Sequence, residues 1–218
     1  TLRRWRHFGL SGATWIWGGE AAAVQPDGRA NPQQTMAIPE NAAGLKQLLD
    51  ELEAAHREQY GTCDDLLVGL QLTHSGRFCR PDSKQLEPRI AYHHPLLDQK
   101  FGIDPADDSV VWTDDDLLRL IDNYVRAAKL ARDANYRFVD IKACHGYLLH
   151  EFLSARIREG RFGGNYEGRT RLLKTIIARV QDEVPGLMVM VRLSVFDVPP
   201  FQTSREVGRP MDYAALLP

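Results

Sequence analysis

The sequence predicts a parallel α/β fold, and more specifically part of a (β/α) barrel. Four short apolar runs rich in β-forming residues alternate with three amphipathic helical patterns, so the order is β, α, β, α, β, α, β. Strict alternation of this kind specifies a parallel sheet with right-handed crossovers. An open dinucleotide-binding sheet would need a G-x-G-x-x-G turn after its first strand, and none follows it here. A barrel is therefore favoured over an open doubly wound sheet.

The apolar runs are short, carry few charges and are rich in branched and aromatic residues. Runs of this kind are typical of strands that are buried on both faces, as in parallel sheets. The expected strands span residues 13–24, 66–74, 138–145 and 187–194.

The segments between the strands carry apolar residues at helical spacing. One of them opens with Thr113 as the expected N-cap and Asp116 three residues later, a variant of the capping box. Another stops before the pair Pro185-Gly186, which favours a helix end. The expected helices span residues 40–59, 113–134 and 169–184, and the basic, aromatic start of the chain is interpreted as the end of a further helix.

Composition favours a single soluble globular domain of 218 residues with a net charge of −2. There is no basic excess to indicate nucleic acid as a partner. The sequence contains no run of eighteen or more apolar residues, which argues against a membrane span. The three cysteines, Cys63, Cys79 and Cys144, are odd in number and far apart, which fits a reducing cytoplasm better than a disulfide framework.

The segment from residue 75 to residue 112 is long and polar, too long for an ordinary connection in a compact domain. Long connections after barrel strands usually build the active-site face, so we expect it to do so here. A closed barrel needs eight strands and about 250 residues, whereas four strands are indicated in this chain. The prediction is therefore one partial barrel domain over residues 1–218.

Several motifs together identify a family. The run 139–171, VDIKACHGYLLHEFLSARIREGRFGGNYEGRTR, is the most specific, and LQLTHSGRFCRP and MVMVRLSVFD flank it in order. The chain resembles the Old Yellow Enzyme family of FMN-dependent NAD(P)H:flavin oxidoreductases and ene-reductases. The resemblance implies that the four strands are the second to fifth of the barrel, with FMN as cofactor and NAD(P)H as electron donor.

The resemblance implies that Ala21, Gln71 and Arg192 contact the flavin. Ala21 matches a small residue that lets the ring approach, Gln71 would bind the pyrimidine edge, and Arg192 would stabilise the anionic reduced ring. From the residues alone, a structural hydrogen bond between Gln71 and the backbone of a neighbouring strand is favoured. For Arg192, a guanidinium expected inside an apolar strand, the alternative is a buried ion pair with a carboxylate such as Asp140.

The resemblance places Lys142, His145 and Tyr147 at the acceptor site. Two side chains in this pattern donate hydrogen bonds to the carbonyl oxygen of a small-molecule substrate, and the tyrosine gives a proton to its α-carbon. Lys142 stands where the family usually has histidine, so it would favour phenolates, carboxylates or nitro groups as readily as enones. Alternatively, Lys142 forms an ion pair with Asp140 or Glu20.

Other reactive residue types in the chain are given structural roles. Cys144 is interpreted as a packing residue, and His74 and Arg77 as parts of the turn that follows the second expected strand. No spacing demands a metal site. The histidines that could be drawn together for one are His93, His94, His145 and His150, and the motif residues assigned to a helix-seating turn are Gly163, Gly164, Glu167, Arg169 and Arg171.

The function predicted on these grounds is hydride transfer from NAD(P)H through FMN to an activated alkene or a similar acceptor. The alternative is a non-catalytic portion or degenerate relative of such an enzyme that no longer binds flavin. A cofactor-free lyase that uses Lys142 as a Schiff base ranks last.

Overall fold

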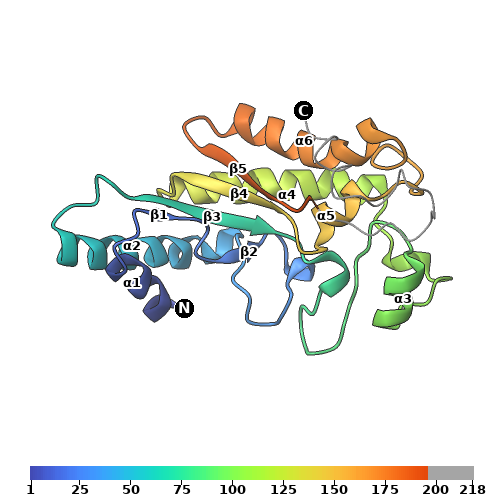
Figure 1. Ribbon diagram of the computed structural model, residues 1–218, viewed down its shortest axis with the longest axis horizontal. Helices are drawn as coiled ribbons and strands as arrows, with labels where there is room; N and C mark the ends of the chain where they lie inside the picture. The colour runs from blue at the N-terminus through green and yellow to red at the C-terminus, as the bar shows by residue number, and fades with distance from the viewer. Residues whose placement is uncertain (196–218) are drawn as a thin grey trace.

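Parallel strands form the centre of the fold (Figure 1). The computed structural model describes residues 1–195, so the end of the predicted domain at residue 218 lies outside the described residues. The strands run in the order β1-β3-β4-β5, with β2 also paired to β3, and every pairing is parallel. The predicted parallel β/α arrangement is confirmed. The strands are β1 (Trp15–Ile16), β2 (Ala21–Ala23), β3 (Leu67–Thr73), β4 (Phe138–Ala143) and β5 (Met188–Leu193).

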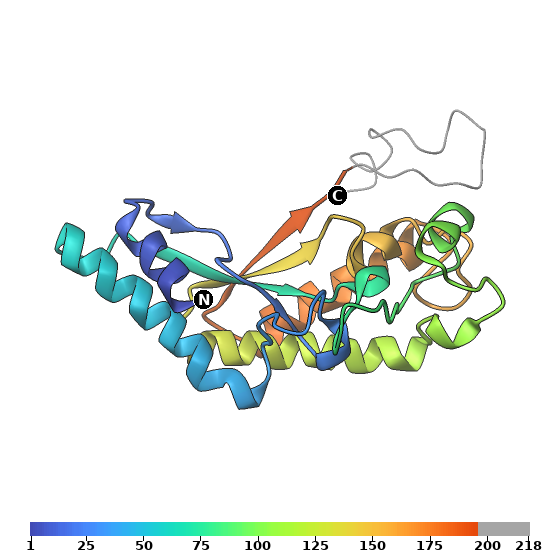
Figure 2. The same cartoon turned by 90° about the horizontal axis from the view of Figure 1, so that it is seen from below.

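Helices α2, α4 and α6 lie along the same side of this sheet (Figure 2). Their starts and ends follow local signals. In α4, the Thr113 hydroxyl accepts a hydrogen bond from the Asp116 amide at 3.1 Å, and the Asp116 carboxylate accepts one from the Thr113 amide at 3.2 Å, so the predicted capping box is confirmed. The α-helices are α1 (Leu2–Leu10), α2 (Ala42–Tyr60), α3 (Pro95–Phe101), α4 (Asp114–Asp133), α5 (Leu148–Leu153) and α6 (Tyr166–Glu183), with 3₁₀ turns at Pro26–Gly28, Pro39–Asn41, Gly76–Phe78 and Asp108–Val110.

The hydrophobic core lies between these helices and the outer face of the sheet. Alternate residues of a strand point to opposite faces, and the outward set of β3 and β4 is fully buried at Leu70, Leu72, Val139 and Ile141. The apolar faces of the expected helices pack against this layer. Their buried residues include Leu45, Leu48, Leu49, Leu52, Leu117, Leu120, Ile121, Tyr124, Leu172 and Ile176. No helix within residues 1–195 is both long and apolar enough to cross a membrane.

The first expected strand, 13–24, is wrong as a single element, because the chain breaks into β1 and β2. Gly18 takes a left-handed conformation with φ +57°, which ends the extended backbone. A Cβ at Gly18 would lie 2.7 Å from Cβ of Gln71, so the backbone there lies directly against β3. Gly18 therefore redirects the chain between the two short strands β1 and β2.

The expected burial of β5 on both faces is also wrong. Met188 and Arg192 are exposed, and the residues between them are half-buried. The reason is position, because β5 pairs with β4 on one side and ends the strand order of the described residues.

The segment 75–112 is more structured than a loop. It contains α3, and residues Ile90 and Val111 form an isolated parallel bridge. Figures 1 and 2 show this segment on the side to which the arrowheads of the strands point. It therefore lies beyond the carboxyl ends of the strands, where barrel active sites are built.

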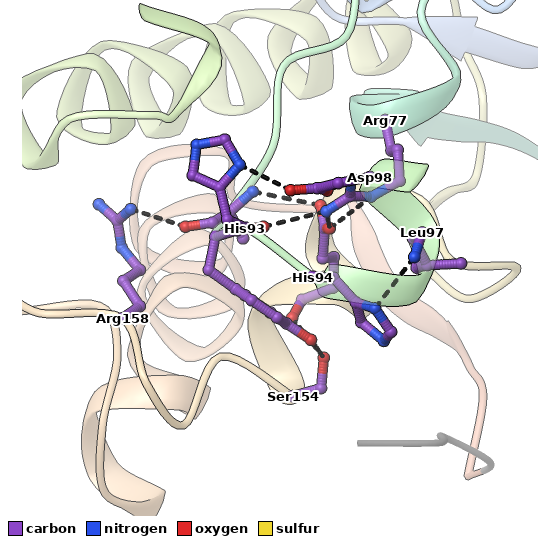
Figure 3. Close-up of polar contacts among 10 residues, drawn as sticks. Arg77, His93, His94, Leu97, Asp98, Ser154 and Arg158 are labelled. Carbon is purple, nitrogen blue, oxygen red and sulfur yellow. Dashed lines mark hydrogen bonds and ion pairs between the residues drawn. The ribbon is translucent and has the colours of Figure 1, made fainter. Parts of the chain in front are cut away.

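A largely buried charge cluster anchors this segment, and we call it the Arg77 cluster: Arg77, Tyr92, His93, Asp98 and Glu151. Figure 3 labels Arg77, His93 and Asp98 of this cluster. The Arg77 guanidinium is 1% exposed and donates to Glu151 at 2.9 Å, to the Tyr92 carbonyl oxygen at 2.9 Å, and to the Asp98 carboxylate. The second Asp98 oxygen contacts His93 Nδ1 at 2.7 Å. One arginine thus joins β3 and its turn to α3 and α5.

Removing Arg77 is expected to destabilise the fold strongly. Arg77→Met leaves Asp98 and Glu151 buried without their cation, so the free energy of unfolding should fall by about 3–5 kcal/mol. Arg119→Met is the matched control, because Arg119 is mostly exposed and pairs with Asp116 on the surface, and it should change the value by about 0.5 kcal/mol or less. Urea unfolding measures both. Equal losses for the two variants would contradict the assigned role of the cluster.

Candidate active site

The register of the sheet places the predicted flavin and substrate residues on its inner face, opposite the helices. Ala21 pairs with Gln71, and Gln71 pairs with Asp140. Two residues further along, Lys142 pairs with Arg192 on the next strand. Paired residues of parallel strands share a face, and so do residues two apart along a strand. All five therefore lie on one face, near the carboxyl ends of the strands.

Gln71 is oriented by a buried carboxylate. Its Nε2 donates to Oδ2 of Asp140 at 2.6 Å, and Gln71 is 5% exposed. Oδ1 of Asp140 is buried and has no hydrogen-bond partner among the described residues. The partner of Gln71 is thus a side chain and not the strand backbone considered from the sequence, and one acceptor beside it remains available.

Lys142 is a buried lysine that packs against an aromatic ring. It is 7% exposed, and Nζ lies 4.0 Å from the centroid of the Tyr147 ring. The ion pairs considered from the sequence are not formed within residues 1–195, because Asp140 bonds to Gln71 and Glu20 pairs with Arg4. Burial lowers the pKa of Lys142, and the charge of Arg192 lowers it further.

His145 follows β4 in an unusual backbone conformation. Its φ is +62°, the left-handed region that non-glycine residues seldom adopt. The ring is exposed, and its centroid lies 6.5 Å from that of Tyr147. Partial burial lowers the pKa of His145, and the charges of Lys142 and Arg192 act in the same direction, so the imidazole is neutral at neutral pH. A neutral ring donates one N–H bond.

Tyr147 is half-buried between the inner face and the segment that follows β3. Its ring lies 5.6 Å from that of Phe78, centroid to centroid. Burial raises the pKa of Tyr147, so the hydroxyl stays protonated at neutral pH and is able to give up a proton. Tyr147 and Ala21 also line one hollow of about 390 Å³ whose other walls are mostly polar, formed by Glu20, Asn31, Gln33, Gln34 and Thr35 among others.

Arg192 differs from its expectation as a buried guanidinium. Its side chain is exposed, and no ion pair with Asp140 forms among the described residues. The cause is the position of β5 at the end of the strand order of the described residues, which leaves the Arg192 side chain exposed.

The residues given structural roles behave accordingly. The Gly76 amide donates to His74 Nδ1 at 3.1 Å, so His74 caps the turn after β3. Cys144 is buried, and all three cysteines are free. Arg169 donates to the Leu153 carbonyl oxygen at 2.6 Å and Arg171 to that of Arg161 at 2.9 Å, so both seat α6. Within residues 1–195 no group of three His, Cys, Asp or Glu side chains is arranged to hold a metal ion.

Two residues near the site, Asp140 and Ser194, were not predicted as site residues from the sequence. Asp140 had entered only as a possible ion-pair partner, yet it orients Gln71 and keeps a free acceptor. Its signal was present, because an acid at the same alternation as Lys142 inside an apolar strand must face the same side. Ser194, whose Oγ accepts from the His145 amide at 3.3 Å, had no comparable signal.

The parallel strands and their covering helices define a partial β/α barrel, and a row of polar residues lies on its inner face near the strand ends. A family model described as NADH:flavin oxidoreductase / NADH oxidase matches residues 12–214. The match covers most of the chain, and the chain therefore belongs to this family.

Individual relatives agree with this family. A NADH:flavin oxidoreductase of Gibberella zeae is 30% identical over 193 residues, which cover 82% of this chain and 44% of that protein. A NADPH dehydrogenase of Bacillus subtilis is 30% identical over 181 residues, covering 82% and 48%. The chain thus spans about half the length of the curated relatives it matches.

Solved structures confirm the partial barrel fold. An Old Yellow Enzyme from a Pichia species matches with a TM-score of 0.63 at 20% identity, over 87% of this chain and 50% of that chain. An Old Yellow Enzyme homologue from Zymomonas mobilis matches with a TM-score of 0.66 at 24% identity, over 87% and 53%.

The left-handed backbone at His145 generates a prediction about stability. His145→Val should lower the free energy of unfolding by about 1–3 kcal/mol, because a β-branched residue is strained at this φ. His145→Gly should stay within about 1 kcal/mol of the wild type, since relief of strain offsets the extra entropy of the unfolded chain.

Chemical denaturation measures both variants. His7→Val is the control, because His7 is exposed in the helix α1, and it should change stability by about 0.5 kcal/mol or less. If the valine variant at 145 were as stable as the glycine variant, the backbone there would not be constrained.

Proposed function

We propose that the protein is an FMN-dependent oxidoreductase that passes hydride from NAD(P)H to an activated alkene or a similar small-molecule acceptor. The carrying observation is the convergence of Gln71, Lys142 and Arg192 on one inner face, with Tyr147 packed against Lys142. Family membership supports the same chemistry.

The residues present fit a flavin. Oδ1 of Asp140 is an orphaned buried acceptor beside the Gln71 carboxamide, which suits a ring edge that offers an N–H group. Ala21 has no side chain beyond Cβ next to Gln71, so a flat ring can approach there. The exposed Arg192 guanidinium is available to the electron-rich end of the ring. We assign Ala21, Gln71 and Arg192 to hold FMN, which supplies hydride transfer when it is bound.

The acceptor side is assigned to Lys142, His145 and Tyr147. The Lys142 ammonium and the neutral His145 ring donate to the acceptor oxygen, which gathers negative charge when hydride reaches the β-carbon. The Tyr147 hydroxyl then gives its proton to the α-carbon. Segment 75–112 would cover this face of the FMN-binding domain, since it follows β3 beyond the strand ends. The three free cysteines fit a cytoplasmic location.

The first test is whether the protein binds flavin. The full-length protein purified with FMN should show the flavin absorption band near about 450 nm, and NADH or NADPH should bleach it. Protein that stays colourless after FMN is added would favour the alternative, a relative that has lost flavin binding.

The proton donor gives a sharper test. Tyr147→Phe should slow reoxidation of the reduced flavin by a conjugated ketone by about 10²–10⁴-fold, because the α-carbon loses its proton source. Reduction by NAD(P)H should change little. Stopped-flow measurement of both half-reactions separates them, and Tyr166→Phe, a half-buried tyrosine at the start of α6, is the control. Equal slowing of both half-reactions would remove Tyr147 from the acceptor chemistry.

A further inference from the structure

Lys142 and Arg192 form a pair of adjacent cations on the inner face of the sheet. They are register partners on neighbouring strands, which run about 5 Å apart. Neither makes an ion pair within residues 1–195. Lys142 is buried, and a buried charge is costly unless an opposite charge compensates it.

The nearby acids do not supply that compensation fully. Glu20 pairs with Arg4, and Oδ2 of Asp140 accepts from Gln71. Burial is the largest cause of the lowered pKa of Lys142. Arg192 lowers this pKa further, whereas Cys144 and Asp140 act in the opposite direction without restoring it. Arg192 is assigned to the flavin, so Lys142 is left as the cation that faces the acceptor. An anion bound there would restore the balance of charge.

We propose that Lys142 makes this acceptor site selective for α,β-unsaturated carboxylates over their neutral counterparts, an inference that rests on the proposed function. The donors are placed for a small planar anion. Lys142 Nζ lies 4.0 Å from the centre of the Tyr147 ring, and the His145 ring lies on the same tyrosine at 6.5 Å between centroids.

A conjugated carboxylate suits this arrangement, because its oxygens are two bonds from the α-carbon that must receive the proton. Oxygens held by Lys142 and His145 therefore bring the α-carbon to Tyr147. The ammonium is a full charge, where a neutral donor offers a dipole, so it stabilises the second negative charge that develops on the carboxylate.

The reaction balances within the proposed function. The hydride that reaches the β-carbon would be supplied by bound, reduced FMN, the carbon–carbon π bond would break, and the Tyr147 hydroxyl would give a proton to the α-carbon. The product is the saturated carboxylate, whose charge is the same as that of the substrate. Tyr147 recovers its proton from water.

The experiment uses the full-length FMN-loaded protein, reduced by NAD(P)H, and three acceptors that share one carbon skeleton: a conjugated acid, its methyl ester and the corresponding aldehyde. Wild-type protein should be reoxidised faster by the acid than by the ester. Lys142→Met should slow reoxidation by the acid by about 10²-fold or more. Reoxidation by the ester should slow much less, so the preference for the acid over the ester inverts. Lys142→His, which carries the family's usual side chain, should also favour the ester.

Two further measurements do not depend on turnover. Calorimetric titration with the saturated acid should show binding weakened by about tenfold or more in Lys142→Met. In the wild type, affinity for this acid should fall as pH rises through the pKa of Lys142, which lies below the ordinary lysine value, since the neutral amine offers no charge. Lys174→Met is the matched control, because Lys174 also lies over a tyrosine ring, that of Tyr166 at 4.9 Å, on the exposed side of α6.

Several outcomes would overturn the proposal. These are a wild-type preference for the ester, an equal effect of Lys142→Met on acid and ester, or a borohydride-trapped adduct of the aldehyde on Lys142, which would make the amine a nucleophile. Failure of NAD(P)H to bleach the flavin would instead refute the proposed function. In that case the titration with the saturated acid still decides whether Lys142 binds carboxylates.

Discussion

The register between β3, β4 and β5 is the constraint on which the site depends. Because side chains alternate along a strand, one residue of slippage would send Gln71 and Lys142 toward the helices and bring Leu70 or Ile141 to the inner face. The buried apolar set on the outer face prevents that slip. Hydrophobic packing on one side of the sheet therefore fixes the positions of the polar groups on the other, although the two sets do not touch.

The Arg77 cluster extends this order beyond the strands. Glu151 lies on α5, one turn after Tyr147, and its amide donates to the Tyr147 carbonyl oxygen at 2.9 Å. Through Glu151, Arg77 links the backbone of Tyr147 to α3 in the segment after β3. Packing of the Phe78 ring between those of Tyr147 and Phe101 follows the same path. The proposed chemistry is assigned to Lys142, His145 and Tyr147, and the largely buried Arg77 cluster anchors the backbone at Tyr147.

Features encoded locally could be predicted from the sequence, and features that depend on distant contacts could not. The cap at Thr113 and the end of α6 depend on a few neighbouring residues, and both were predicted. The row of inner-face residues followed from alternation together with the family motifs. By contrast, Arg77 meets Glu151 across 74 positions of sequence, and no local pattern announces that pair. The exposure of Arg192 depends on what lies beside β5, which its own apolar neighbours do not reveal.

Positions 142 and 145, which hold the two proposed acceptor-side donors, differ in how freely they tolerate substitution. The turn at His145 admits few residue types, because most side chains clash in a left-handed backbone. Lys142 lies in regular extended backbone within β4, where many side chains fit. Natural drift or a mutant library can therefore vary position 142 at small structural cost while position 145 stays nearly fixed. In this fold, a change of acceptor preference is therefore easier to reach by substitution at position 142 in β4 than by substitution at position 145 in the turn that follows.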